Sequence, residues 1–199
     1  ANSNYNDTEI ELNKKFDQFL TDYNGRVTLG SVYAIAENYG WEKPKIKFWY
    51  STDGKIKIMQ TRFIRFLESC GYFKLYLNPG HVLIRIKDNV VEEIETVNIK
   101  DYVIDYVNNL SEEDLDGVEG PDLLEVIVRG NNVYFGSSQL EFLSPIELFF
   151  SRDSLNKSLI YFQNGYVEVT KNSYLLVNFK KLEGYVWKHQ ILNRAFKES

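Results

Sequence analysis

The sequence is poor in the residues that build redox and soft-metal sites. Its 199 residues include one cysteine, Cys70, two histidines and one methionine. A single cysteine cannot form a disulfide within the chain, and a structural zinc site takes four cysteine or histidine ligands, more than the chain holds. We therefore expect neither a disulfide nor a zinc site, and the sequence predicts no cofactor.

Long hydrophobic runs are also absent. A membrane-spanning helix needs roughly 18 consecutive apolar residues, a length that no apolar run in the sequence reaches. The first residues, from Ala1 to Asn4, lack the basic and then apolar pattern of a secretory signal. These absences predict a soluble, cytoplasmic protein with no membrane partner. Because the chain does not begin with Met, we expect it to be a segment of a longer protein.

The motifs of common enzyme classes are missing. There is no glycine-rich loop ending in Gly-Lys-Ser/Thr, no Gly-x-Ser-x-Gly turn, no His-Glu-x-x-His helix and no Gly-x-Gly-x-x-Gly. The densest acidic cluster contains Asp114 and Asp116, a spacing compatible with Mg²⁺ because hard cations prefer clustered carboxylates. That cluster lies in a glycine-containing stretch, where solvated loop acids are the simpler explanation. We therefore expect no catalytic residues.

The chain is acidic in total, but its charges are segregated. The formal net charge is −5, from 23 lysines and arginines and 28 aspartates and glutamates. Residues 41–90 contain 10 basic and 4 acidic residues, whereas residues 91–130 contain 2 basic and 12 acidic ones. Local potential governs which partner approaches which surface. The basic block can therefore attract phosphates, and the acidic stretch 92–125 can repel them or dock against a basic protein.

Periodicity predicts an α+β fold in which antiparallel β-meanders pack with helices. The chain is expected to open with a helical hairpin. Thr8 and Glu11 form a capping box, apolar residues then recur at helical spacing, and a second helix runs to about Tyr39. This helical segment, residues 1–42, is the first predicted domain.

The second predicted unit, residues 43–115, alternates strands with helices. Alternation on both sides of Asp53-Gly54 predicts a hairpin, and a helix with an apolar face follows over 63–70. Next come three strands and a further helix, which is capped by Thr96 or Asn98. The three strands are expected at 72–77, 81–87 and 90–94.

The third predicted unit, residues 116–199, is α+β and ends in a second meander. Residues 111–122 are rich in acid and glycine, which indicates a linker or a long surface loop between the units. The first hairpin of the second meander contains Asn164-Gly165, a pair typical of a type I′ turn. The two units either remain separate or form one continuous domain.

Alternation in residues 45–87 sorts the side chains of two hairpins into an apolar set and a basic, aromatic set. If both hairpins share one sheet, the second set offers cations for phosphates and rings on which bases stack at roughly 1–3 kcal/mol each. The predicted nucleic-acid-binding residues are Lys45, Lys47, Trp49, Lys55, Lys57, Tyr72, Lys74, Tyr76, Arg85 and Lys87. In the plainer alternative, this is the polar face that an antiparallel sheet turns to water.

Six short segments are familiar as a set. They are Lys47–Tyr50, Phe63–Leu67, Leu83–Ile86, Asn98–Val103, Tyr161–Val169 and Leu182–Trp187. In this order they resemble the region upstream of the helicase core in primase-helicases of phages and integrated elements, the poxvirus-like branch of superfamily-three helicases. The resemblance implies a DNA-replication protein whose phosphate-binding loop lies beyond Ser199 and whose polymerising site lies before Ala1.

The sequence thus predicts a noncatalytic module of a phage-type primase-helicase, which contacts single-stranded or forked DNA or neighbouring subunits during replication. One alternative is a protein-interaction module that uses the acidic stretch 92–125, either for self-association or for binding other replication proteins. A second alternative is a Mg²⁺-dependent nucleic-acid enzyme that uses Asp114 and Asp116.

Overall fold

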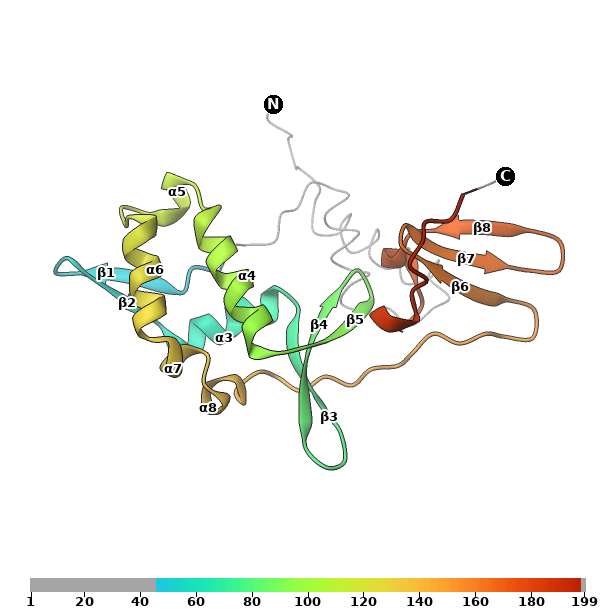
Figure 1. Ribbon diagram of the computed structural model, residues 1–199, viewed down its shortest axis with the longest axis horizontal. Coiled ribbons are helices and arrows are strands. Elements are labelled where there is room, and N and C mark those ends of the chain that lie inside the picture. Colours follow the sequence, from blue (N-terminus) through green and yellow to red (C-terminus); the bar gives the residue numbers. More distant parts are fainter. Residues whose placement is uncertain (1–45, 198–199) are drawn as a thin grey trace, which may run out of the picture. The chain divides into compact units, whose positions relative to one another are not determined.

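The computed structural model describes residues 46–197, which belong to a compact unit that begins at Lys43. The helical hairpin predicted for residues 1–42 and the predicted phosphate contact Lys45 lie outside the described residues. The described chain has an α+β fold, in which helices pack with three separate sheets (Figure 1).

The sheets have the strand orders β1-β2, β3-β4-β5-β9 and β6-β7-β8. All neighbouring strands are antiparallel except β5 and β9, which are parallel. The strands are β1 (Trp49–Thr52), β2 (Lys55–Ile58), β3 (Tyr72–Tyr76), β4 (His81–Lys87), β5 (Val90–Ile94), β6 (Ser158–Phe162), β7 (Gly165–Val169), β8 (Tyr174–Val177) and β9 (Val186–Trp187). Both predicted meanders are confirmed, whereas β9 was not predicted because two residues are too few to show a period.

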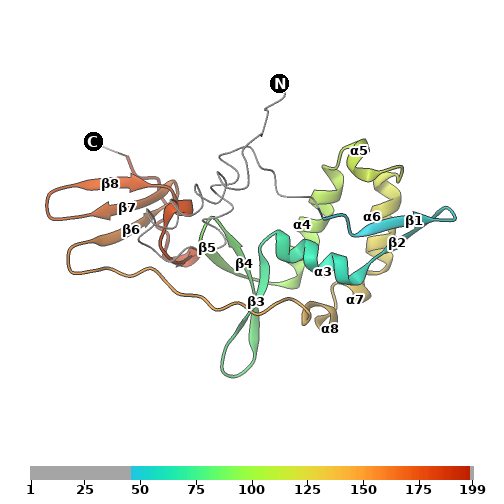
Figure 2. The same cartoon turned by 180° about the vertical axis from the view of Figure 1, so that it is seen from behind.

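Most of the helices lie between the two meanders in the sequence. They are α3 (Gln60–Ser69), α4 (Thr96–Asn108), α5 (Glu112–Leu115), α6 (Gly120–Arg129), α7 (Asn131–Tyr134) and α8 (Ser137–Leu140), with 3₁₀ turns η1 (Phe179–Lys181) and η2 (Lys188–Gln190). Helix α6 packs beside α4 and against β2, and the two opposite views agree on this arrangement (Figure 1, Figure 2).

Helix α3 forms where the apolar spacing predicts it. Its buried side chains are Phe63, Ile64, Phe66 and Leu67, which follow the i, i+3, i+4 spacing of one helix face. The helix stops at Gly71, whose φ of +90° lies in the left-handed region. A β-carbon at Gly71 would also approach the backbone oxygen of Ile86 to 2.2 Å, so only glycine fits this junction.

The N-cap of helix α4 lies one residue before Thr96, the first of the two predicted caps. Glu95 is the N-cap, and its backbone N–H donates to Oδ1 of Asn98 at 2.8 Å in a capping box. Thr96 is therefore the first helical residue rather than a cap. The buried residues Ile99, Val103 and Val107 recur every four positions, so this face of α4 packs into the core.

Residues 111–122 lie mostly at the surface, as a surface loop would, but they contain helical turns and contact the main core, which a linker between separate units would not do. They contain helix α5 and the start of α6, and Val118 between them is buried in the main core. The indole Nε1 of Trp49 donates to the backbone oxygen of Leu115 at 3.5 Å, which ties the stretch to β1. The acidic and glycine-rich composition concealed two apolar residues, Leu115 and Val118, that pack against the core.

The main hydrophobic core crosses the predicted boundary at residues 115/116. It combines side chains of β1, α3, β3 and α4 with Val118 and with residues of α6 and α8. The aromatic rings at its centre pack closely, as the 4.7 Å between the Phe48 and Phe66 centroids shows. The first part of the third predicted unit, up to Leu143, therefore shares this core with the second unit.

A smaller core lies under the second meander and contains Tyr166, Phe179, Leu182 and Val186. The predicted Asn164-Gly165 type I′ turn is not formed. Register pairs Phe162 with Gly165, so the two turn residues are Gln163 and Asn164, and neither has a positive φ. Gly165 instead belongs to β7, where a β-carbon would come within 2.5 Å of the Val177 oxygen.

The two meanders are joined through the turn between β4 and β5. The side-chain amide of Asn89 donates to the carbonyl oxygens of Phe179, Lys180 and Leu182 at 3.1, 3.3 and 3.2 Å. The backbone N–H of Val186 donates to the Asn89 oxygen at 3.0 Å, which starts the parallel pairing of β9 with β5. This turn therefore anchors the chain that leaves the second meander.

Candidate nucleic-acid interface

The register of the β1–β2 hairpin places Trp49 and Tyr50 on the opposite faces to those predicted. Trp49 lies directly across from Ile58, and Tyr50 lies across from Lys57. A two-residue turn at Asp53-Gly54 pairs odd residues of one strand with even residues of the other, and directly opposed side chains share a face. The predicted face grouped odd residues with odd ones, which this turn does not allow.

Trp49 is consequently part of the core and cannot stack on a base, so its assignment as a stacking residue is wrong. Its side chain is 2% exposed, and its ring packs edge-on against Phe48 with centroids 4.9 Å apart. Tyr50, which the alternation of β1 assigns to the apolar set because it is adjacent to Trp49, is 40% exposed beside Lys57. Tyr50 is therefore the aromatic residue that this hairpin presents.

In the second hairpin the register matches the prediction, but helix α4 covers part of the face. Tyr72 pairs with Arg85 across β3 and β4, as expected for two residues of one face. Tyr72 is nevertheless 1% exposed, with its ring centroid 5.4 Å from that of Tyr102 in α4. Burial raises the pKa of the Tyr72 phenol to about 12, against a smaller opposing effect of Arg85. Tyr72 therefore cannot act as a stacking residue either.

The single basic face predicted for the two hairpins does not form, because β1–β2 and β3–β4 belong to different sheets. Two of its lysines are also engaged within the chain. Nζ of Lys47 forms an ion pair with Asp116 at 2.5 Å, and Nζ of Lys74 donates to the Glu141 backbone oxygen at 2.5 Å. The hydrogen bond from Lys47 also lowers the pKa of the Asp116 carboxyl.

An exposed basic segment remains around β2 and α3, and we define it by Tyr50, Lys55, Lys57, Arg62 and Arg65. All five side chains are exposed, and none of the four cations forms an ion pair within residues 46–197. The sequence between Gly54 and Leu67 contains no acidic residue. The charges of these four exposed cations are thus not neutralised by an ion pair with any carboxylate of residues 46–197.

The predicted nucleic-acid-binding residues do not include Arg62 and Arg65, although the sequence contains a signal for them. Arg62 and Arg65 stand three residues apart in α3, on either side of the buried pair Phe63 and Ile64. Side chains at i and i+3 lie on the same helix face. The exposed face of the amphipathic helix α3 thus indicates surface cations in the same way as the alternating strands do.

The tip of the β3–β4 hairpin carries Tyr76, an exposed member of the predicted set, and Lys87 is exposed at the opposite end of β4. Tyr76 is 63% exposed, Lys74 lies over its ring with Nζ 5.6 Å from the centroid, and the His81 ring is edge-on at 6.4 Å. This tip projects away from the neighbouring elements in both views (Figure 1, Figure 2). Tyr76 is therefore available for stacking, with a cation already beside its ring.

The carboxylates of Asp114 and Asp116 both contact other side chains of the fold. Asp114 accepts a hydrogen bond from Oγ of Ser111 at 2.8 Å, and Asp116 pairs with Lys47. Residues 46–197 hold no group of three or more histidine, cysteine, aspartate or glutamate side chains that could bind a metal ion. Asp114 thus contacts the N-cap residue of α5, and Asp116 connects this stretch to Lys47, 69 residues away in the sequence.

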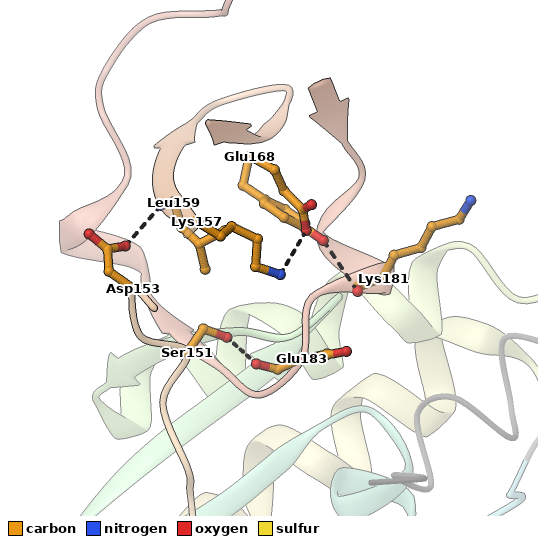
Figure 3. Close-up of polar contacts among 8 residues, drawn as sticks. Ser151, Asp153, Lys157, Leu159, Glu168, Lys181 and Glu183 are labelled. Carbon is orange, nitrogen blue, oxygen red and sulfur yellow. Dashed lines mark hydrogen bonds and ion pairs between the residues drawn. The ribbon is translucent and has the colours of Figure 1, made fainter. Parts of the chain in front are cut away.

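Polar contacts around the second meander hold its strands and loops together (Figure 3). Nζ of Lys157 pairs with Glu168 at 3.3 Å, and the Asp153 carboxylate accepts the backbone N–H of Leu159 at 2.9 Å. The Tyr166 hydroxyl donates to the Lys181 oxygen at 3.3 Å, and burial and the neighbouring Glu168 raise its pKa. Each of these groups has a partner within the fold, which indicates a structural role.

Comparisons with known protein families, with curated proteins and with solved structures found nothing that matches this chain. No helix within residues 46–197 is long and apolar enough to cross a membrane.

Proposed function

We propose that this chain is a noncatalytic nucleic-acid-binding module that contacts single-stranded or forked DNA. The observation that carries the proposal is the exposed basic segment, whose four cations form no ion pair with another residue between 46 and 197. The resemblance to the region upstream of the helicase core in phage-type primase-helicases supports the same assignment. In that setting the module would couple a ring-forming helicase to its DNA.

Two kinds of contact would contribute to binding. Lys55, Lys57, Arg62 and Arg65 would neutralise phosphates and release counterions, which makes binding depend on salt. Tyr50 and Tyr76 would offer exposed rings for bases, each worth roughly 1–3 kcal/mol. Neither contact reads a base edge, so we expect little sequence preference.

The experiment is a fluorescence anisotropy titration of labelled single-stranded DNA at several salt concentrations. The variant replaces Lys57, Arg62 and Arg65 by Glu. We expect the slope of log affinity against log salt to fall by roughly 0.7 per lost contact, about 2 in total. The proposal is wrong if affinity and slope stay as in the unsubstituted chain.

A matched control variant changes the same net charge elsewhere, with Arg152, Lys171 and Lys197 replaced by Glu. These three are exposed and belong to the second meander or its flanks. If both variants lose affinity equally, the effect is one of total charge and not of the basic segment. Sedimentation of the same samples tests the alternative: salt-sensitive self-association without DNA binding would favour docking through the acidic stretch 92–125.

A further inference from the structure

A groove of about 530 Å³ lies between strands β4 and β5 and the chain that follows β9. Arg85 and Lys87 of β4 line one side, and Lys188 and Asn193 line the other, with Gln163 from the β6–β7 turn. Small-molecule sites in proteins commonly measure about 300–1,000 Å³ and combine apolar walls with a few polar groups. The groove has this size and this mixture of residues.

Positive charge is in excess in the groove. Its two carboxylates both have lysine partners: Glu92 pairs with Lys188 at 2.5 Å, and Asp88 lies 3.9 Å from Lys180. Glu92 also stands across from Arg85 in the β4–β5 register, yet no ion pair joins them. Arg85 and Lys87 are thus the groove cations whose charge no carboxylate within residues 46–197 neutralises.

Arg85 is held in place without a hydrogen-bond acceptor. Its guanidinium carbon lies 5.2 Å from the Tyr72 ring centroid and 4.7 Å from that of Tyr102, so two aromatic rings fix the group. Its Nε is buried and has no partner in the described part of the chain. Arg85 as a whole is only partly buried and lines the groove, so an anion there would bind the rest of its guanidinium group and not the buried Nε.

The side-chain amides of Gln163 and Asn193 lie on the opposite side of the groove and offer an acceptor group and a donor group to a ligand. Nε2 of Gln163 donates to Oδ1 of Asn193 at 2.6 Å, which fixes the orientation of both groups. The carbonyl oxygen of Gln163 and the amide nitrogen of Asn193 are then left to bind an external partner. Apolar wall is provided by Val90 and Ile191. A phosphate near Arg85, a planar ring along the wall and a base edge at the amides would use all of these features.

We propose that this groove binds a nucleoside 5′-phosphate, with Arg85 and Lys87 as the phosphate ligands. The chemistry is the same for a free mononucleotide and for the 5′-phosphorylated end of a DNA strand. The site is separate from the exposed basic segment and does not depend on the function proposed for that segment.

The test uses calorimetric titration of the full chain with deoxyadenosine 5′-monophosphate, with deoxyadenosine and with inorganic phosphate. We expect the nucleotide to bind most tightly, phosphate weakly and the nucleoside not measurably. Lys87→Gln, at an exposed position, should weaken nucleotide binding about tenfold, a typical loss for one charge-assisted hydrogen bond. Lys171→Gln is the matched control, because Lys171 is also an exposed lysine but does not line the groove. No saturable nucleotide binding, or equal binding by all variants, overturns the proposal.

Arg85 needs two variants because its side chain also packs against aromatic rings. Arg85→Lys keeps the charge and should retain weakened binding, whereas Arg85→Gln should abolish it. If Arg85→Gln unfolds, Lys87→Gln and Arg85→Lys still decide the result. A 5′-phosphorylated oligonucleotide that competes better than its unphosphorylated form identifies a strand end as the ligand, and equal competition identifies the free nucleotide. Substitution of the exposed basic segment should leave mononucleotide binding unchanged, which keeps the two proposals distinguishable.

Discussion

Individual residues in this chain have roles that depend on burial more than on chemical type. Three aromatic residues were assigned to base stacking, and only Tyr76 is exposed, because Trp49 and Tyr72 fill the main core. Arg85 lies between the rings of Tyr72 and Tyr102, where a side chain expected on the surface is partly enclosed. An aromatic residue beside lysines in the sequence is therefore weak evidence for a stacking site.

The buried phenol of Tyr72 predicts a loss of stability in alkali. Its pKa is about 12 in the folded chain and about 10 when unfolded, so the unfolded state loses its proton first as pH rises. The contribution of the Tyr72 phenol to the free energy of unfolding is therefore complete below pH 10 and decreases as the pH rises from 10 to 12. At pH 11 the loss from this residue should be about 1 kcal/mol.

Urea unfolding at pH 8 and at pH 11 measures this effect. Tyr72→Phe keeps the ring but has no ionisable hydroxyl, so its stability should fall less between the two pH values than that of the parent chain. Tyr174→Phe, at an exposed site, is the matched control. An equal fall in Tyr72→Phe and in the parent would show that Tyr72 does not contribute.

At the scale of secondary-structure elements, most spans were predictable because local patterns decide them. Helix α3 and the strands of both meanders follow apolar periodicity and turn residues such as Asp53-Gly54, where both φ angles are positive. The sequence did not predict which elements pack against one another. The face that a strand buries depends on its register and on the helix that covers it, and α4 covers a face that alternation alone had placed in solvent.

The register of β1–β2 predicts opposite outcomes for two neighbouring residues. Trp49→Ala should reduce the free energy of unfolding by about 3–5 kcal/mol, because it leaves a large cavity in the core. Tyr50→Ala should change it by less than about 1 kcal/mol, since exposed positions tolerate truncation. Equilibrium unfolding in urea measures both, and similar losses at the two positions would contradict the observed register.

At the scale of the whole described chain, long-range contacts join parts that composition had separated. The main core includes residues from both sides of 115/116, and β9 adds to the first meander's sheet from a distance of nearly one hundred residues in the chain. The Asn89 turn makes this connection through three side-chain hydrogen bonds and one backbone bond. The groove that we propose as a nucleotide site exists only because β9 returns to β5.

Asn89→Gly tests the connection without disturbing the turn. Glycine accepts the positive φ of 63° at this position but has no amide to donate. We expect a loss of about 1–3 kcal/mol in the free energy of unfolding and faster hydrogen exchange at the Val186 amide, which bonds to the Asn89 oxygen. Asn172→Gly, in the exposed β7–β8 turn, is the control. Unchanged exchange at Val186 would show that the amide does not hold β9 in place.

The sequence by itself determined the α+β class, the helix and strand spans of the two meanders and the position of the basic block, because each depends on neighbouring residues along the chain. Only the tertiary structure decided which rings are exposed, that residues 111–122 fold onto the core, and that Arg85 and Lys87 share a groove with Lys188. These features depend on packing between distant segments. One or two apolar side chains, such as Leu115 and Val118, or a two-residue strand such as β9 contribute to such packing without leaving a periodic signal in the sequence.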